Sequence, residues 1–286
     1  MPEHCDELAR LERLESLGRR RPVYRTEKGI LKVCGSPHEA VSEARSLEMA
    51  RETIGRHQRV PRLRELSGNL LLIEDVGPDP LTTERHVQSA AEYLASIHQT
   101  EINQSLIDRL EEGRFHHYWK EYLLNRLRRE VALSQRGNLP GEQTERFRAA
   151  TEIVANVPLP LHSHVVGHGD PRAMNFVVGD GQEPCAVDWK DFGLSNRWYE
   201  IAHFVNSLEE GHRDAAIAAY RVRAGLTDFA QWELAHAYGV AVSSVIRVGT
   251  VARNARTENH KSSRSFTRSV ARLQRAIDSL MNQNWA

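Results

Sequence analysis

The amino-acid sequence predicts an α+β fold in which a small strand-rich lobe is followed by a larger helical lobe. Short runs of β-forming residues separated by turn residues occupy positions 1–77, whereas apolar residues at helical spacing dominate positions 78–286. A β-rich island at 162–192 interrupts the helical part. The turn-forming segment Gly-Pro-Asp-Pro at 77–80 separates the two patterns, so we expect an N-terminal lobe over 1–77 and a C-terminal lobe over 78–286.

The first lobe is expected to contain a hairpin, a helix and two further strands. Two β-rich runs around a Gly-containing turn predict the hairpin, and a run of Ala, Glu, Arg and Leu that ends at Gly55 predicts the helix. Leucines at helical spacing within residues 1–17 predict a helix there, although 11–17 is also compatible with a first strand. The expected hairpin strands lie at 23–26 and 30–34, the helix at 38–57, and the later strands at 62–65 and 70–73.

The second lobe is expected to be helical on both sides of the β-rich island. Inside the island, turn residues at 179–184 join two short strands. If Val178 pairs with Cys185, Asn175 lies opposite Asp188 at the same end of this hairpin. The expected helices lie at 84–100, 105–135, 141–156, 196–210, 212–224, 226–252 and 262–283.

The composition excludes several classes of protein. The 286 residues are 40% hydrophobic and 27% charged, which is typical of a globular protein rather than a disordered one. No apolar run approaches the ~20 residues of a membrane-spanning helix. Three scattered cysteines without a CxxC pattern predict neither a disulfide framework nor a structural zinc site. Residues 1–10 contain three acidic residues and no apolar run, so we expect no secretory signal and a cytoplasmic location.

Polar residues around the island hairpin are candidates for metal binding and for proton transfer. Opposed residues in a hairpin have Cβ atoms about 5 Å apart, so the Asn175 amide and the Asp188 carboxylate could bind one hard cation such as Mg²⁺. Asp170 lies on the loop that enters the hairpin, and its carboxylate could accept a proton from an attacking hydroxyl group.

The order His168-Gly-Asp170-x-x-x-x-Asn175, followed by Asp188-Trp, resembles the signature of aminoglycoside phosphotransferases and choline-kinase-like enzymes. These enzymes are relatives of the protein kinases, whose HRDxxxxN and DFG motifs occupy the same places. The resemblance implies a two-lobed, protein-kinase-like fold with ATP or GTP as co-substrate. It also implies that Asp170 is the catalytic base, that Asn175 and Asp188 hold Mg²⁺ on the nucleotide phosphates, and that His168 braces the catalytic loop.

The resemblance extends upstream to the nucleotide site. Lys32 matches the lysine that binds the α- and β-phosphates, and Glu43 matches its ion-pair partner, although Glu39 and Glu48 are rivals in register. The phosphate-covering loop falls at 17–23, where Arg19 and two further arginines replace a glycine-rich run. These arginines either help to hold the phosphates or face the substrate.

Further matches bring the resemblance to about residues 18–210. The segment Leu71–Gly77 resembles the hinge, where backbone groups of Glu74 and Val76 would contact the base. His98 ends a helix as in the family's LH pattern, and Glu200 takes the place of the usual Asp in its YDLA segment, in a supporting role. One departure is Lys190, at a position that is often acidic in relatives.

The sequence indicates the class of the phosphoryl acceptor less clearly than it indicates the nucleotide site. His168-Gly-Asp170 lacks the arginine that protein kinases use, and only 11 residues separate Asp188 from Glu200, which favours a small-molecule kinase. Residues 211–286 carry eleven basic and five acidic residues, which favours a neutral or anionic hydroxyl substrate over a polycationic one. Nucleic-acid and membrane partners are not expected. The alternatives are an aminoglycoside-type antibiotic kinase, a protein kinase, and a nucleotide-sensing binding module.

Overall fold

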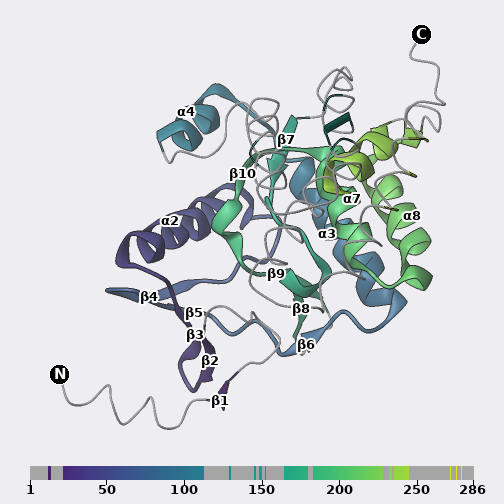
Figure 1. Ribbon diagram of the computed structural model, residues 1–286. Coiled ribbons are helices and arrows are strands. Elements are labelled where there is room, and N and C mark those ends of the chain that lie inside the picture. Colours follow the sequence, from purple (N-terminus) through teal and green to yellow (C-terminus); the bar gives the residue numbers. More distant parts are fainter. Residues whose placement is uncertain are drawn as a thin grey trace.

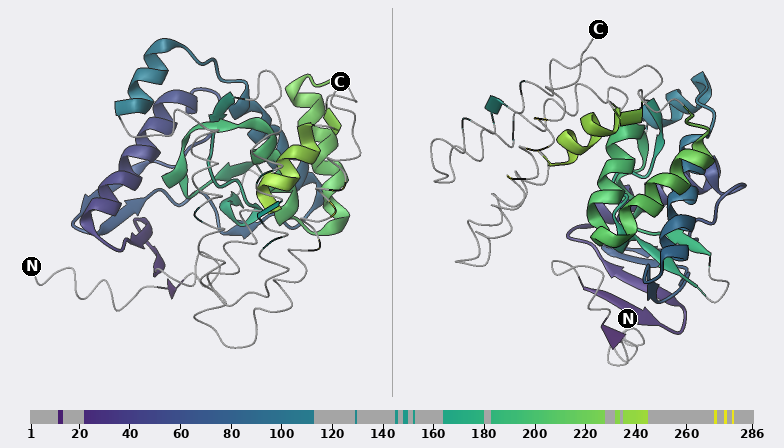
Figure 2. Two further views of the ribbon diagram at one scale, coloured as in Figure 1. Left: turned by 45° about the horizontal axis from the view of Figure 1, so that its top comes forward. Right: turned by 90° about the vertical axis from the view of Figure 1, so that its right-hand side faces the viewer.

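The computed structural model confirms the α+β class. It describes residues 12–13, 22–112, 164–179, 183–227, 232–233 and 235–244, together with positions 129, 145, 148, 149, 152, 271, 275 and 278. Most residues of the expected helices at 105–135, 141–156 and 262–283 lie outside the described residues. An N-terminal antiparallel sheet lies at one end of the described part, and helices α7 (Arg197–Ser207) and α8 (Arg213–Ala224) lie at the other (Figures 1 and 2). No described helix has the length and apolar content needed to cross a membrane.

The N-terminal sheet has five strands in the order β1-β2-β3-β5-β4, all antiparallel to their neighbours. The turn at Glu27–Lys28 closes the predicted β2–β3 hairpin, in which Val23 pairs with Lys32. The residues of β1 pair with β2, so this part of the first segment is a strand rather than a helix. The strands are β1 (Glu12–Arg13), β2 (Val23–Thr26), β3 (Gly29–Val33), β4 (Leu63–Ser67) and β5 (Leu70–Ile73).

Helix α2 (Pro37–Ile54) packs against this sheet as predicted (Figure 1). The Ser36 side chain caps its N-terminus by accepting a hydrogen bond from the Glu39 amide, and Pro37 begins the first turn. Its apolar face buries Ala40 and Ala44 against the strands. Since Glu43 lies next to Ala44 on this buried face, the packing carries a carboxylate into the protein beside β3.

The helical part is built around α3 (Glu84–His98), which packs against α8 (Arg213–Ala224), as Figure 1 shows. Small alanines at buried positions of α3 let neighbouring elements approach closely. The other described helices are α4 (Gln104–Glu112) and α7 (Arg197–Ser207), with further helical residues between 232 and 244. One continuous hydrophobic core joins α3, α7, α8 and the strands of the island.

The island contributes strands to two small sheets. Strand β7 (His164–Gly167) pairs with β10 (Gly193–Asn196), and β8 lies between β6 and β9. Short 3₁₀ turns connect these strands. The remaining elements are β6 (Asp79–Pro80), η2 (Ala173–Asn175), β8 (Phe176–Val178), β9 (Pro184–Ala186), η3 (Trp189–Asp191) and η4 (Glu210–His212).

The predicted register of the β8–β9 hairpin is wrong by one residue. Val178 pairs with Pro184 rather than with Cys185. Proline lacks a backbone donor and is tolerated as the first residue of a strand, so β9 begins at Pro184 instead of after it. Asn175 therefore lies opposite Val187, whose amide donates to the Asn175 carbonyl at 2.8 Å.

Asp188 lies one residue beyond the paired positions and has a left-handed backbone conformation with φ of 65°. It is the one non-glycine residue with positive φ in the described part of the chain. Such a conformation costs about 1–2 kcal/mol for most residues and is better tolerated by aspartate. Strain of this kind is typical of functional sites.

Candidate active site

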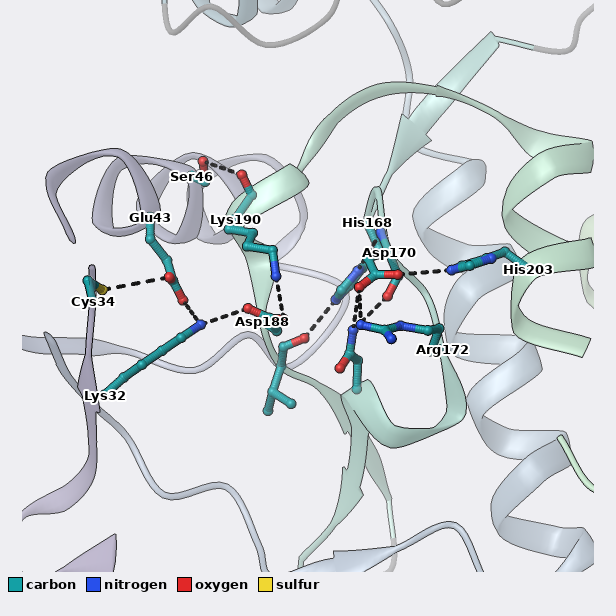
Figure 3. Close-up of polar contacts among 12 residues, drawn as sticks. Lys32, Cys34, Glu43, Ser46, His168, Asp170, Arg172, Asp188, Lys190 and His203 are labelled. Carbon is teal, nitrogen blue, oxygen red and sulfur yellow. Dashed lines mark hydrogen bonds and ion pairs between the residues drawn. The ribbon is translucent and has the colours of Figure 1, made fainter. Parts of the chain in front are cut away.

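Charged side chains from β3, from α2 and from the residue before η3 come together at Lys32, as Figure 3 shows. The Lys32 Nζ atom on β3 donates to Asp188 Oδ1 at 2.8 Å and also forms a short ion pair with Glu43 Oε1 on α2. Burial alone would lower the pKa of Lys32, but the charges of Asp188 and Glu43 outweigh it and raise that pKa. The lysine is therefore fully charged and held in place.

The structure selects Glu43 among the three candidate partners of Lys32. Glu39 instead accepts a hydrogen bond from the Gly35 amide at 2.9 Å, near the start of α2. Glu48 is exposed on the opposite part of the helix. Because α2 buries the face that contains Glu43, that carboxylate reaches β3.

Asp188 is bonded to two lysines. Lys190 Nζ donates to Asp188 Oδ2 at 2.9 Å, while Lys32 occupies Oδ1. Burial would raise the pKa of Asp188, but the positive charges of Lys32 and Lys190 lower it to about 2. The carboxylate is thus ionised and can act as an anionic ligand.

Asp170 lies on the loop between β7 and η2, and both of its carboxylate oxygens are hydrogen-bonded. Oδ1 is 2.9 Å from His203 Nε2 on α7, and Oδ2 is 2.5 Å from Arg172 Nη2 (Figure 3). Burial would raise the pKa of Asp170, but the hydrogen bond and charge of His203, together with the Arg172 charge, hold it well below its usual range. Asp170 is therefore a firmly ionised acceptor.

Asn175 is hydrogen-bonded to Asp170 and lies opposite Val187, the residue before Asp188. Its Nδ2 donates to the Asp170 carbonyl at 2.7 Å. Among the described residues both hydrogen bonds of this amide use Nδ2, which leaves Oδ1 as an oxygen ligand. Amide and carboxylate oxygens fit Mg²⁺, which usually binds one or two protein ligands together with substrate phosphates. No cluster of three or more His, Cys, Asp or Glu residues that could hold a metal ion occurs in the described ranges.

His168 connects the catalytic loop to the strand that leads to Asp188. Its ring is fully buried, its Nε2 donates to the Val187 carbonyl at 2.9 Å, and its Nδ1 accepts from the Asp170 amide at 3.3 Å. The ring centroid lies 4.5 Å from that of Trp189. These contacts fit the expected bracing role and leave no ring nitrogen for substrate.

Glu200 hydrogen-bonds the backbone of the same loop. Its carboxylate accepts from the amides of His168, at 3.0 Å, and Gly169, at 2.7 Å. It also accepts from His98 Nε2 at 3.1 Å, while His98 Nδ1 is 2.6 Å from the hydroxyl of Tyr220. Burial lowers the pKa of His98 and raises that of Tyr220, so a neutral histidine accepts from Tyr220 and donates to Glu200. The resulting chain joins α8, α3 and α7 to the catalytic loop.

The predicted hinge residues lie between the N-terminal sheet and the β8–β9 hairpin. The Glu74 carboxylate is turned toward Arg59 Nη2, at 3.3 Å, and the Arg62 amide, at 3.1 Å. Val76 is buried against Val177 and Cys185. The base contacts expected here remain a prediction. Arg19 and its neighbouring arginines lie outside the described residues.

Sequence reasoning missed several residues of the site. His203 lies three residues after Glu200 on α7, so both point from one helix face toward the catalytic loop, and this spacing was an available signal. Arg172 is two residues from Asp170. By contrast, Tyr220 is 122 residues from His98, and no local pattern indicates that pair.

Comparison with known proteins agrees with this geometry. Residues 13–235 match the family described as the phosphotransferase enzyme family, and a search of curated proteins finds no significant match. A choline/ethanolamine kinase family protein from Mesorhizobium loti is similar at 15% identity and a TM-score of 0.66, over 99% of this chain and 92% of that one.

Two antibiotic phosphotransferases are similar to the same extent. The macrolide 2'-phosphotransferase from Brachybacterium faecium has 16% identity and a TM-score of 0.61, over 96% of this chain and 93% of its own. The GDP and kanamycin complex of APH(2")-IIia has 13% identity and a TM-score of 0.67, over 94% of this chain and 93% of its own. At these identities the likeness concerns the fold. Since the family match covers most of the chain, the protein belongs to the phosphotransferase enzyme family and has the two-lobed, kinase-like fold of these enzymes.

Proposed function

We propose that this protein is a Mg²⁺-dependent kinase that transfers the γ-phosphoryl group of ATP or GTP to a hydroxyl group of a small molecule in the cytoplasm. The observation that carries the proposal is the contact of Lys32 with both Glu43 and Asp188. It places a fixed cation beside an ionised carboxylate at the point where a nucleotide's phosphates would lie. Phosphoryl transfer depends mainly on such positioning and charge.

On the nucleotide side, Lys32 binds phosphate oxygens, and Asp188 Oδ and Asn175 Oδ1 would hold Mg²⁺. When bound, that ion neutralises phosphate charge and orients the γ-phosphoryl group. Glu43 keeps the lysine directed into the site, because the ion pair limits its rotamers.

On the acceptor side, Asp170 accepts a hydrogen bond from the attacking hydroxyl and aligns its oxygen with phosphorus. A carboxylate has about four lone-pair positions, so an acceptor can bind beside His203 and Arg172. Because the pKa of Asp170 lies far below neutrality, the carboxylate is a weak base. Its main contribution is orientation, and it receives the proton as the new oxygen–phosphorus bond forms.

The segment after Asp188 favours a small acceptor over a protein. Residues 188–200 are occupied by η3, by strand β10 paired with β7, and by the first turn of α7, which Asn196 caps. Every part of this stretch is therefore committed to the fold. No described residue in it is left to form a peptide-positioning loop.

Charges at the catalytic loop favour a neutral or anionic acceptor. Arg172 lies beside Asp170, and its side chain is 40% exposed. His203 contacts the other oxygen of Asp170. A polycationic acceptor would meet the guanidinium first, and like charges brought together in this way disfavour binding.

A phosphorylation screen tests the proposal. Purified protein with Mg²⁺ and either ATP or GTP is incubated with amino alcohols, sugars, nucleosides and aminoglycosides, and products are identified by mass spectrometry. We expect a phosphorylated hydroxyl compound from the neutral or anionic classes. The matched control is Asp170→Asn, which preserves shape and should lose turnover by about 10²–10⁴-fold while binding nucleotide normally. Tight nucleotide binding without turnover on any acceptor would instead favour a nucleotide-sensing module.

A further inference from the structure

Lys190 contacts the carboxylate that is expected to bind the metal ion. Its Nζ lies 2.9 Å from Asp188 Oδ2, and the two lysines approach Asp188 from different directions (Figure 3). Each oxygen of this carboxylate therefore bonds an ammonium group. Both ammonium groups repel a divalent cation that approaches Asp188, so binding of the cation favours the departure of one lysine.

Of the two lysines, Lys190 is the one that can leave. Lys32 is 14% exposed and keeps Glu43 as a second carboxylate partner. Lys190 is 39% exposed, and Asp188 is the one carboxylate that it hydrogen-bonds among the described residues. An ion pair this exposed contributes little to stability, so breaking it costs little.

The backbone of Lys190 stays fixed when its side chain moves. The Ser46 hydroxyl of α2 donates to the Lys190 carbonyl at 3.3 Å, and the preceding Trp189 is buried in the core. The η3 turn packs on α2, the helix that also carries Glu43. Because this backbone is fixed, the Lys190 ammonium group stays within a side chain's length of Asp188 when it is displaced. The nucleotide phosphates would lie within the same distance.

We propose that Lys190 is a second phosphate-binding lysine, which pairs with Asp188 when no nucleotide is bound and moves to the nucleotide phosphates when a divalent cation binds Asp188. The inference rests on the proposed function. A compact ammonium group with three donors suits phosphate oxygens. Every charge stays paired in this exchange, because Asp188 binds the divalent cation while Lys190 binds the phosphates.

Binding measurements on Lys190→Met and Lys190→Arg test this exchange. Nucleotide affinity is measured by isothermal titration calorimetry with Mg²⁺, and Mn²⁺ affinity without nucleotide by electron paramagnetic resonance. For Lys190→Met we expect Mg²⁺–ATP binding to weaken about tenfold, Mg²⁺–ADP binding to weaken less, and adenosine binding to stay unchanged. Mn²⁺ alone should bind several-fold more tightly, since its competitor is gone. Lys190→Arg should keep most of the nucleotide affinity because it retains the charge.

The control is Lys28→Met, which removes one positive charge from the β2–β3 turn and should leave all these affinities unchanged. If Lys190→Met binds Mg²⁺–ATP as well as the wild type, or more tightly, the exchange is refuted, while the proposed function stands. If the wild-type protein binds no nucleotide, both the proposed function and this inference are overturned.

Discussion

Replacing Glu200 with glutamine should destabilise the protein by about 3 kcal/mol. The carboxylate is fully buried and accepts three hydrogen bonds, from the amides of His168 and Gly169 and from His98 Nε2. A hydrogen bond to a charged group contributes about 1.5–3 kcal/mol, and a neutral one about 0.5–1.5 kcal/mol. Neutralising the acceptor of three bonds therefore loses about 1 kcal/mol for each. In addition, the side-chain NH₂ group of glutamine would face one of these N–H donors, and two donors cannot form a hydrogen bond with each other.

Urea denaturation at pH 7 measures this loss as a lower midpoint with an unchanged slope. Glu209→Gln is the matched control, since Glu209 is exposed at the end of α7 and its replacement should change stability by less than about 0.5 kcal/mol. Equal stability of Glu200→Gln and the wild type would show that the buried carboxylate does not stabilise the catalytic loop.

The pH dependence of the stability difference between the wild type and Glu200→Gln provides a second check. The pKa of Glu200 is below its ordinary value of 4.5, because the hydrogen bonds from His98 and from the Gly169 amide outweigh the effect of burial. A lowered pKa in the folded state gives stability that is complete above pH 4.5 and is lost as pH falls through the folded pKa. The difference between wild type and Glu200→Gln should therefore shrink below pH 4.5. A difference that is constant down to pH 3 would refute the reasoning.

Three further predictions concern single residues of the site and the core. Gly169→Ala should abolish turnover and lower stability by several kcal/mol, because Gly169 has φ of 87° and a Cβ atom would lie 2.0 Å from the Asp191 carbonyl oxygen; turnover and urea denaturation measure both effects. His203→Ala should lower kcat about tenfold with little change in nucleotide affinity, since it removes the partner that orients Asp170, and His203→Asn should recover part of kcat; steady-state kinetics of both variants tests this. Burial raises the pKa of the Cys185 thiol to about 12, so a thiol reagent at pH 8 should modify Cys185 only after unfolding, as peptide mass mapping would show.

Local patterns in the sequence predicted much of the N-terminal half. The hairpin around Glu27–Lys28 and the helix ending before Gly55 were both expected, because turn residues, caps and helix-forming runs act over a few positions. The loop from His168 to Asn175 was also recognised, since its residues have fixed spacing. In each case the residues that determine the structure are close together in the chain.

One error and one unresolved alternative arose where local signals are ambiguous. The β8–β9 pairing differs by one residue from the prediction, since a loop rich in turn residues fits more than one register until Pro184 is placed at the start of β9. Glu43 could not be separated from Glu39 and Glu48 by spacing alone. Glu43 lies on the buried face of α2, and which face of the helix is buried is determined by tertiary packing.

The sequence by itself determined the fold class, the order of strands and helices in the first lobe, and the residue types that could carry phosphoryl transfer. Only the tertiary structure decided which side chains are partners. Lys32 and Asp188 are 156 residues apart, and His98 and Glu200 are 102 residues apart. Distances between such residues depend on how whole elements pack against one another, whereas sequence spacing informs only about neighbours within an element. For the same reason, the pairing of His203 with Asp170, 33 residues apart, became evident only in three dimensions.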